Sequence, residues 1–265
     1  MEDTLGKKIF RIAWKTAAWF VGVSIFSVVL FRFVPIPVTP LMLIRSVEQV
    51  FSVGKVRLKH DWVSIDEISK NLPLAVVCSE DQNFMNHSGF DMKAIHQSVE
   101  VAKHGGRLRG ASTISMQVAK NLFLTRERTF SRKFEETFIT MALEQNLSKE
   151  RIMEIYLNII EWGDGIYGIG PAASFYFNKP PRNLKPVESA FLASIIARPG
   201  KNWKPDPLTK ISEGWWKYLQ LILCKMYERG GADIADLREA GVPEERIREL
   251  VEDKGQDESV PSPPE

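Results

Sequence analysis

The sequence predicts an all-α protein with one N-terminal transmembrane helix. Three observations lead to this fold class: apolar residues recur at helical spacing along most of the chain, alternation typical of strands is scarce, and residues 12–34 are almost continuously apolar. The 265 residues, 44% of them hydrophobic, can fill one sizeable core or two small ones. We therefore expect one folded domain over residues 35–250, preceded by a short segment, 1–11, and the apolar segment, and followed by a tail, 251–265.

The apolar segment is long enough to cross a lipid bilayer as a helix. No charged residue occurs from Thr16 to Phe31, and the helix over 12–34 would extend about 35 Å. A cleaved signal peptide is the alternative, but its apolar region would be only about 7–15 residues long and would end at a small-residue cleavage site. Here the segment runs into Arg32 and a proline-rich stretch. The positive-inside rule places segment 1–11 in the cytoplasm and the domain across the membrane. The basic residues on which this rests are Lys7, Lys8, Arg11 and Lys15.

The domain begins with an extended linker, because Pro35, Pro37 and Pro40 end the first helix and keep the chain after it extended. Helical periodicity then predicts seven helices, and we expect the second of them to begin at Asn83 or Asp81. A basic loop rich in glycine follows this second helix. The predicted helices are residues 65–72, 84–101, 112–124, 129–145, 148–160, 186–197 and 213–228.

Two other patterns in the sequence do not indicate a cofactor site. G-D-G-I-Y-G at 163–168 matches a dinucleotide-binding motif in its letters, but that motif needs a preceding strand inside a βαβ unit. The preceding residues have helical spacing, so we interpret the glycines as a tight loop. Cys78 and Cys224 show no metal or disulfide spacing, which leaves their pairing open. After Asp253 almost no apolar residue remains, and this predicts a disordered tail.

Charge is unevenly distributed along the chain, although the net charge is only +2. Residues 103–133 contain eight Lys or Arg and a single acid, Glu127, whereas residues 229–265 contain eleven acids and five bases. A local surplus of positive charge favours a polyanionic or phosphorylated ligand, and the alternative is a solvated helical face.

Glu80 and Asp81 closely follow an apolar run, L-P-L-A-V-V, and form the first candidate catalytic element. Burial of Glu80 and repulsion from Asp81 would both raise the pKa of Glu80, as a general base that works near neutral pH requires. The alternative is structural, since an acid before the predicted helix 84–101 would cap its free backbone amides.

Polar residues on the third and fourth predicted helices form the second candidate element. Thr113, Gln117 and Lys120 lie on one face of residues 112–124. A surface ion pair between Arg132 and Glu136, worth roughly 0.3–0.5 kcal/mol, is the alternative interpretation of the fourth helix. Cations near the start of a helix are disfavoured by its dipole, however, and this predicts a bound anion. The polar residues of the fourth helix are Arg128, Arg132 and Glu136.

Four stretches of the chain follow recognisable patterns. They are E-D-x-x-F-x-x-H-x-G at 80–89, G-x-S-T-I-x-x-Q-x-x-K-N at 110–121, R-K-x-x-E at 132–136 and K-x-x-I-x-E-x-Y-L-N at 149–158. In this order they resemble the motifs of the peptidoglycan glycosyltransferases of glycosyltransferase family 51, and within it the monofunctional biosynthetic transglycosylases. Many members have paired glutamines where this chain has Met116 before Gln117.

The resemblance implies a lysozyme-like, two-lobed domain that polymerises lipid II. It implies that Glu80 deprotonates the 4-hydroxyl of the acceptor GlcNAc, and that attack opposite the donor's diphosphate forms an inverted, β-1,4 link. Glu136 would be a second essential carboxylate that organises cations, with or without a divalent metal ion (Mg²⁺ or Mn²⁺), and no other cofactor is implied. Residues 154, 156 and 158 would be architectural. The residues that would hold the sugar-diphosphate region are Ser112, Gln117, Lys120, Asn121, Arg128, Arg132 and Lys133.

The implied partners are lipid II, the growing glycan strand, the membrane and other cell-wall synthesis proteins, with no nucleic acid. The implied location is the bacterial cytoplasmic (inner) membrane, with the domain on the periplasmic or extracellular side. Two other classes remain open. A glycan-cleaving muramidase would share the fold but would not explain the cations at 103–133, and a non-catalytic membrane scaffold would explain the transmembrane helix but predicts nothing about Glu80.

Overall fold

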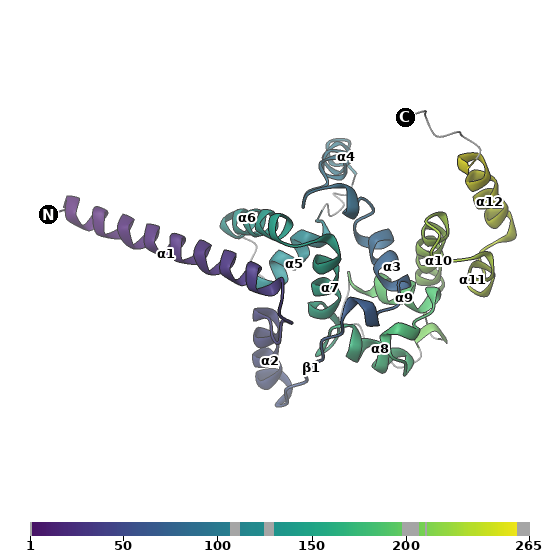
Figure 1. Ribbon diagram of the computed structural model, residues 1–265, viewed down its shortest axis with the longest axis horizontal. Coiled ribbons are helices and arrows are strands. Elements are labelled where there is room, and N and C mark those ends of the chain that lie inside the picture. Colours follow the sequence, from purple (N-terminus) through teal and green to yellow (C-terminus); the bar gives the residue numbers. More distant parts are fainter. Residues whose placement is uncertain (1, 107–111, 125–129, 198–206, 210, 259–265) are drawn as a thin grey trace.

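Helices dominate the computed structural model, which describes residues 2–106, 112–124, 130–197, 207–209 and 211–258 (Figure 1). One long helix projects from a body in which the other helices pack together, so the predicted all-α class is confirmed. Three short strands complete the body: β1 (Lys59–His60), β2 (Glu161–Gly163) and β3 (Ile166–Tyr167). The helices are α1 (Glu2–Phe31), α2 (Pro40–Val53), α3 (Asn71–Glu80), α4 (Met92–Lys103), α5 (Ile114–Phe123), α6 (Phe130–Asn146), α7 (Lys149–Ile159), α8 (Ile169–Phe177), α9 (Pro186–Ile195), α10 (Glu213–Glu228), α11 (Ile234–Glu239) and α12 (Glu244–Glu258).

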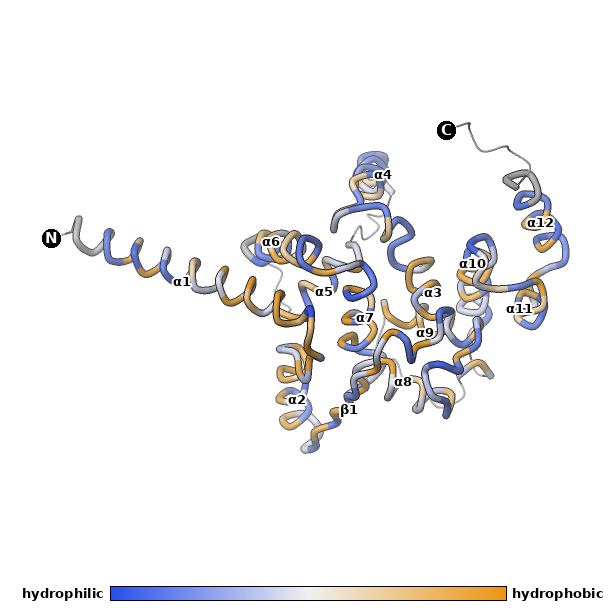
Figure 2. Tube along the Cα trace, viewed as in Figure 1, coloured by the Kyte–Doolittle hydropathy of each residue, from blue (hydrophilic) through white to orange (hydrophobic). Residues whose placement is uncertain are grey.

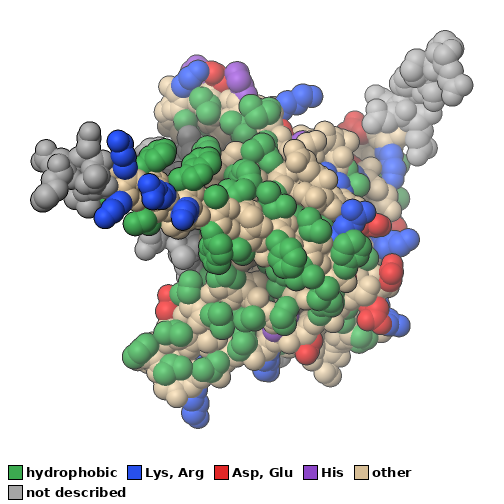
Figure 3. Space-filling model, turned by 60° about the vertical axis from the view of Figure 1, so that its left-hand side comes forward, with side chains coloured by type: hydrophobic (Ala, Val, Ile, Leu, Met, Phe, Trp, Pro, Cys, Tyr) green, Lys and Arg blue, Asp and Glu red, His purple; other side chains and the backbone are tan. Residues whose placement is uncertain are grey.

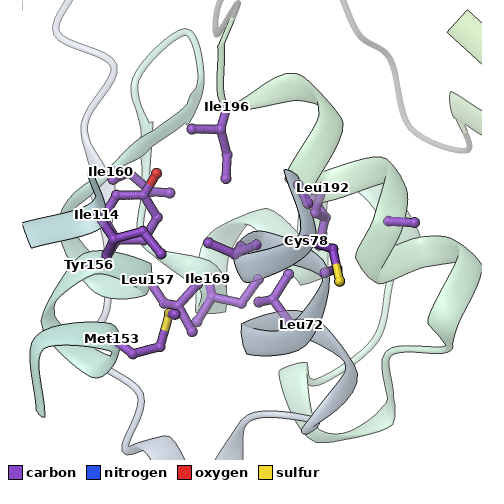
Figure 4. Close-up of a cluster of buried hydrophobic side chains, with 14 of the residues drawn as sticks. Leu72, Cys78, Ile114, Met153, Tyr156, Leu157, Ile160, Ile169, Leu192 and Ile196 are labelled. Atoms are coloured by element: carbon purple, nitrogen blue, oxygen red, sulfur yellow. The ribbon is translucent and has the colours of Figure 1, made fainter. Parts of the chain in front are cut away.

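The helices of the body form two groups. In the first group α3, α9 and α10 pack against one another, and α11 and α12 extend this group from α10. In the second group α5 packs against α6 and α7, and α2 packs against α5. Leu72 and Phe191 in the first group and Ile139 in the second are completely buried. A shared apolar cluster joins the groups, with Leu72 on one side and Ile114 on the other (Figure 4). This is the two-lobed arrangement that the resemblance implies.

Helix α1 is long and apolar enough to cross a membrane over Gly6–Phe31. Its hydropathy increases from a hydrophilic beginning toward the body (Figure 2). Most of its side chains are exposed, but Val28 is completely buried near the end of the helix, where α1 lies against α6. Arg151 of α7 donates hydrogen bonds of 2.9 Å to the carbonyl oxygens of Phe31 and Val34. The end of α1 is therefore fixed to the body.

Two predicted helices, on either side of Glu80, have the wrong bounds. Only a single 3₁₀ turn, Ile65–Glu67, forms in the first of them, and the α-helix that follows starts at Asn71 and ends at Glu80. The apolar run before Glu80 is therefore part of a helix. The start of this helix is hard to predict from the sequence for two reasons. Pro73 suggests a break, although proline is tolerated in the first turn of a helix, and the apolar run contains no polar residue that would mark a start.

The second incorrect helix was predicted over residues 84–101. Residues Phe84–Asn86 form a 3₁₀ turn, and α4 begins only after Asp91, whose Oδ1 accepts a hydrogen bond of 2.9 Å from the backbone N–H of Ala94. Gly89 interrupts the segment, because its φ of +90° is a conformation that other residues rarely adopt. The helix consequently begins neither at Asn83 nor at Asp81.

Five predicted helices are confirmed with small changes in bounds: α5, α6, α7, α9 and α10. Side-chain caps explain where two of them begin, since Thr113 accepts from the N–H of Met116 (3.2 Å) and Ser148 from that of Arg151 (3.2 Å). Helices α2, α8, α11 and α12 were not predicted. Because α12 runs to Glu258, part of the tail that we expected to be disordered, 251–265, is helical, and residues 259–265 lie outside the described ranges.

In the segment G-D-G-I-Y-G at 163–168, residues 164 and 165 form the turn between β2 and β3, so the tight turn that we expected there is confirmed, although the residues on both sides of it are in strands. The three strands are ordered β1-β3-β2, with β3 parallel to β1 and antiparallel to β2. Gly165 has a φ of +73°, and a Cβ atom there would lie 1.7 Å from the carbonyl oxygen of Arg57. Only glycine fits this position. The sheet thereby holds β1 against the end of α7.

Candidate active site

A cleft of about 530 Å³ contains eight of the nine predicted site residues. Residues of α5 and α6 line this cleft together with Glu80 at the end of α3 and two residues just after α9. The ninth predicted residue, Arg128, lies outside the described residues. The eight residues in the cleft are Glu80, Ser112, Gln117, Lys120, Asn121, Arg132, Lys133 and Glu136.

Glu80 lies where this cleft meets a second cleft of about 360 Å³. The second cleft is bounded by α4 and by residues near Asp81 and Asp91, and Ser112 lines both clefts. Because Glu80 is the last residue of α3, the alternative that it caps helix 84–101 is wrong. Its carboxylate can instead be reached by two molecules, one from each cleft.

Cations of α10 hold the end of α3 that carries Glu80. Lys225 Nζ donates to the carbonyl oxygen of Cys78 (3.4 Å), and Arg229 Nη2 donates to that of Gln82 (3.1 Å). Positive charge at this end of a helix is favoured by the helix dipole. Cys78 and Cys224 are both buried, free thiols. The Cys78 sulfur accepts a hydrogen bond from Arg229 Nη1 (3.2 Å), and burial raises the pKa of this thiol, which does not suit it as a nucleophile.

The partner of the Glu80 carboxylate is a neutral amide. Gln117 Nε2 on α5 donates a hydrogen bond of 2.9 Å to Glu80 Oε2. Burial raises the pKa of Glu80, the Gln117 hydrogen bond and the charge of Lys120 lower it, and the charge of Asp81 raises it further. The net direction is upward, which moves Glu80 toward the range in which a carboxylate is an effective general base.

Asp81 has a different role from its neighbour. Its Oδ2 accepts from the backbone N–H of Ile114 (3.0 Å) at the start of α5, and its two oxygens lie 2.9 and 3.1 Å from His87 Nε2. A carboxylate is favoured at this end of a helix. The capping function that the sequence suggested for this acidic pair therefore belongs to Asp81, for a distant helix. By joining the end of α3 to the start of α5, Asp81 sets the separation between Glu80 and Gln117.

Glu136 is only 3% exposed and is bonded to cations through both of its oxygens. Arg132 Nη1 lies 2.7 Å from its Oε2, and Lys133 Nζ lies 2.5 Å from its Oε1. An ordinary surface ion pair is excluded, because Glu136 is withdrawn from the solvent that would weaken it. These two cations and one carboxylate together carry one net positive charge.

Three residues of the fourth motif are part of α7, and two of them have the architectural roles that we expected. Asn158 Oδ1 accepts from the N–H of Val63 (2.8 Å), and Glu154 Oε1 accepts from Trp62 Nε1 (3.2 Å). Tyr156 differs, because its hydroxyl donates to Oε1 of Gln117 (3.1 Å) and so reaches the active site. Sequence reasoning missed this contact, since nothing in the pattern separates Tyr156 from its buried neighbours.

Met116 stands where the resemblance implies the first of two glutamines. Its side chain is 5% exposed and lines the larger cleft. At this position the chain therefore presents an apolar wall to a ligand, and Gln117 alone supplies the amide.

The described residues do not form a ready metal site. Among them, no group of three or more His, Cys, Asp or Glu side chains is gathered closely enough to hold a metal ion. Both oxygens of Glu136 are already bonded to Arg132 and Lys133, so this carboxylate does not fit a divalent cation in the present arrangement. The two side chains supply positive charge themselves. A requirement for Mg²⁺ or Mn²⁺ stays a prediction.

A base and several cations that line one cleft suit an enzyme that transfers a group from a phosphorylated donor. A family model described as "Transglycosylase" matches residues 47–226 of this chain. A biosynthetic peptidoglycan transglycosylase of Bacteroides thetaiotaomicron is 45% identical over 193 residues, which cover 73% of this chain and 78% of that protein. Proteins of the same name from Mannheimia succiniciproducens (40% over 201 residues; 75% and 82% covered) and Pseudomonas aeruginosa (36% over 230 residues; 86% and 96% covered) are similar as well. The chain belongs to the transglycosylase family.

Proposed function

We propose that Glu80 is the general base with which this transglycosylase joins lipid II units into peptidoglycan glycan strands. One observation carries the proposal: a single cleft contains Glu80 together with three cations, Lys120, Arg132 and Lys133. A diphosphate is already a good leaving group, so this reaction needs positive charge at the diphosphate and a base for the acceptor hydroxyl. Both are present in this cleft.

In the proposed reaction the Glu80 carboxylate takes the proton from the 4-hydroxyl of the acceptor GlcNAc. The acceptor oxygen attacks C1 of the donor MurNAc on the side opposite the diphosphate, the bond from C1 to the diphosphate oxygen breaks, and undecaprenyl diphosphate leaves. The α-linked donor is thereby converted into a β-1,4 link. Lys120, Arg132 and Lys133 stabilise the negative charge that develops on the leaving group, and Glu136 holds the last two in place.

The two clefts that meet at Glu80 suit a reaction between two sugar substrates. The larger cleft contains the cations and is assigned to the donor with its diphosphate. The smaller cleft has polar side chains of α4, such as Gln97 and Ser98, and is assigned to the acceptor sugar. A base at the junction can take a proton from a molecule in one cleft while that molecule attacks a second molecule in the other.

Two other functions are less well supported. A muramidase would need a protonated acid beside the bond that it cleaves, together with a second carboxylate, whereas Glu136 is fully engaged by Arg132 and Lys133. A non-catalytic scaffold gives no reason for a carboxylate with a raised pKa at the junction of two clefts.

Helix α1 would anchor the enzyme in the bacterial cytoplasmic membrane, with residues 1–11 in the cytoplasm and the body on the other side, because all the basic residues of α1 come before its uncharged part, residues 16–31. Hydrophobic side chains gather on the face that carries α1 and α2 (Figure 3), and Val47, Val50 and Phe51 of α2 are exposed there. Such a face suits contact with lipid, where a lipid-linked substrate resides. Labelling of cysteines introduced before and after α1 tests this orientation. Contacts with other cell-wall proteins stay predictions.

Polymer formation from purified lipid II tests the catalytic proposal. We expect Glu80→Gln to lower the rate by about 10³-fold or more, because an amide keeps the shape of the side chain but accepts no proton. Helix content should be unchanged. The matched control is Glu67→Gln, which alters an exposed acid paired with Arg182 away from the cleft and should leave the rate unaltered. A Glu80→Gln protein that polymerises lipid II normally would refute the assignment.

A further inference from the structure

Tyr156 is a buried tyrosine whose hydroxyl faces the active site. The residue is completely buried and lies beside Ile114 in the apolar cluster (Figure 4). Its hydroxyl donates to Gln117 Oε1 at 3.1 Å, and Gln117 Nε2 donates to Glu80 Oε2 at 2.9 Å. Two consecutive hydrogen bonds therefore connect α7, α5 and α3 and end on the carboxylate.

The two ends of the Gln117 amide have different requirements. An ionised carboxylate only accepts hydrogen bonds, so Glu80 requires the NH₂ end. The oxygen end then points toward buried surroundings, where an acceptor without a partner is costly. The Tyr156 hydroxyl supplies that partner, and a donor on the amide oxygen also strengthens the amide N–H as a donor. Without this hydroxyl, the amide could find a partner for its oxygen only by turning toward the water in the cleft that it lines.

We propose that Tyr156 is a positioning residue for the reaction. Its hydroxyl holds the Gln117 side chain at Glu80, so that the ionised Glu80 carboxylate keeps a hydrogen bond from the Gln117 amide. The proposal rests on the proposed function, because it takes Glu80 as the base. It also changes the role of Gln117 from binding substrate to supporting the base.

The other charged and titratable groups near Glu80 are known, which makes the effect of Tyr156 separable. Asp81 raises the pKa of Glu80, and Lys120 of α5 lowers it. The pKa of the Tyr218 phenol on α10 is raised mainly by burial and, to a smaller extent, by the charge of Glu80. The pKa of Tyr156 is raised well above its ordinary value, first by burial and then by Glu80 and Asp81, so its hydroxyl remains a donor throughout the pH range of the reaction.

The direction of the effect on activity follows from this arrangement. A donor to the charged form of a carboxyl lowers its pKa, so loss of the donor raises the pKa of Glu80. The base must be ionised to act, and the acidic limb of the profile of kcat/KM against pH therefore moves to higher pH. For Tyr156→Phe we expect an upward shift of about 0.5–1 pH unit, with several-fold lower activity near the limb and little loss at high pH.

The experiment measures lipid II polymerisation against pH for the full chain in detergent, together with the unfolding temperature. Gln117→Met should shift the limb by about 1 unit. The double variant should shift no further than Gln117→Met, because Tyr156 acts through Gln117. Tyr176→Phe is the matched control: it removes another buried hydroxyl, which donates to the carbonyl oxygen of Trp162 (2.9 Å) and lines neither cleft, and it should leave the limb in place.

Each outcome decides one question. A Tyr156→Phe protein that loses activity equally at every pH, or a double variant whose shift is the sum of the single shifts, overturns the positioning role. If Tyr156→Phe does not fold, an unshifted limb in Gln117→Met overturns it as well, and a shifted limb supports it. An active Glu80→Gln protein overturns the proposed function itself. An inactive Glu80→Gln protein with an unshifted Tyr156→Phe profile overturns only the inference about Tyr156.

Discussion

Glu80 and Glu136 share one cleft but have opposite surroundings. Glu80 ends a helix, and its hydrogen-bond partner is a neutral amide from another helix. Glu136 lies within a helix, and its partners are two cations one turn earlier on the same helix. The comparison shows that burial and the nature of the partners together decide the chemistry of a carboxylate. Glu80 has a raised pKa and can move a proton, whereas Glu136 is placed to organise positive charge.

The largest expected effect that tests this division comes from Glu136→Gln. Loss of the charge releases Arg132 and Lys133 from their common partner, so the cations no longer stabilise the leaving group as a fixed pair. We expect polymerisation to fall by about 10²–10³-fold, as when one preorganised electrostatic group is removed. The acidic limb of the profile of kcat/KM against pH should stay where it is. A limb that moves or disappears would mean that Glu136 also carries the catalytic proton, and the comparison would fail.

An intermediate effect on ligand binding is expected when a cation near Glu80, Lys120, or a cation paired with Glu136, Lys133, is removed. Lys120→Ala and Lys133→Ala should each weaken binding of a diphosphate-containing inhibitor by about tenfold, because each removes one charge-assisted contact. Only Lys120→Ala should also shift the acidic limb to higher pH, since Lys120 lowers the pKa of Glu80. Calorimetry and pH profiles of the two variants measure this. Equal shifts in both would show that Lys133 acts on the pKa of Glu80 as strongly as Lys120 does.

The smallest expected effect concerns stability. The pKa of Glu80 is raised in the folded protein, so the folded state binds more protons than the unfolded state between the two pKa values. The native protein therefore loses stability as pH rises through that window. Glu80→Gln escapes this loss, and its unfolding temperature at pH 7 should be higher than that of the unaltered protein by about 1–3 °C.

Below this window the difference should vanish, because Glu80 is then protonated in both states. Glu136→Gln should have the opposite effect at pH 7, since it breaks a buried ion pair. Thermal unfolding followed by circular dichroism at both pH values measures this. If Glu80→Gln instead lowers the unfolding temperature at pH 7, the ionised Glu80 carboxylate makes a net stabilising contribution to the folded state, which contradicts this prediction.

Much of the site could be predicted from the sequence because its residues are close together along two helices. Gln117 and Lys120 are three residues apart in α5, and Arg132 and Glu136 are four apart in α6, so helical spacing places each pair on one face. The region around Glu80 could not be predicted in the same way. There the helix bounds depend on the cap at Asp91 and on the φ of Gly89, which periodicity does not report.

The sequence by itself determined the helical class, the membrane-spanning length of α1 and eight of the residues that line the larger cleft, because these depend on local periodicity, hydropathy and short motifs. Only the tertiary structure decided which carboxylate is paired with cations and which with an amide. The Gln117 contacts join residues 37 and 39 positions apart in the chain. Burial and the choice of partner in such contacts are set by how helices pack, and the spacing of residues along one helix contains no information about the atoms that a second helix brings to it.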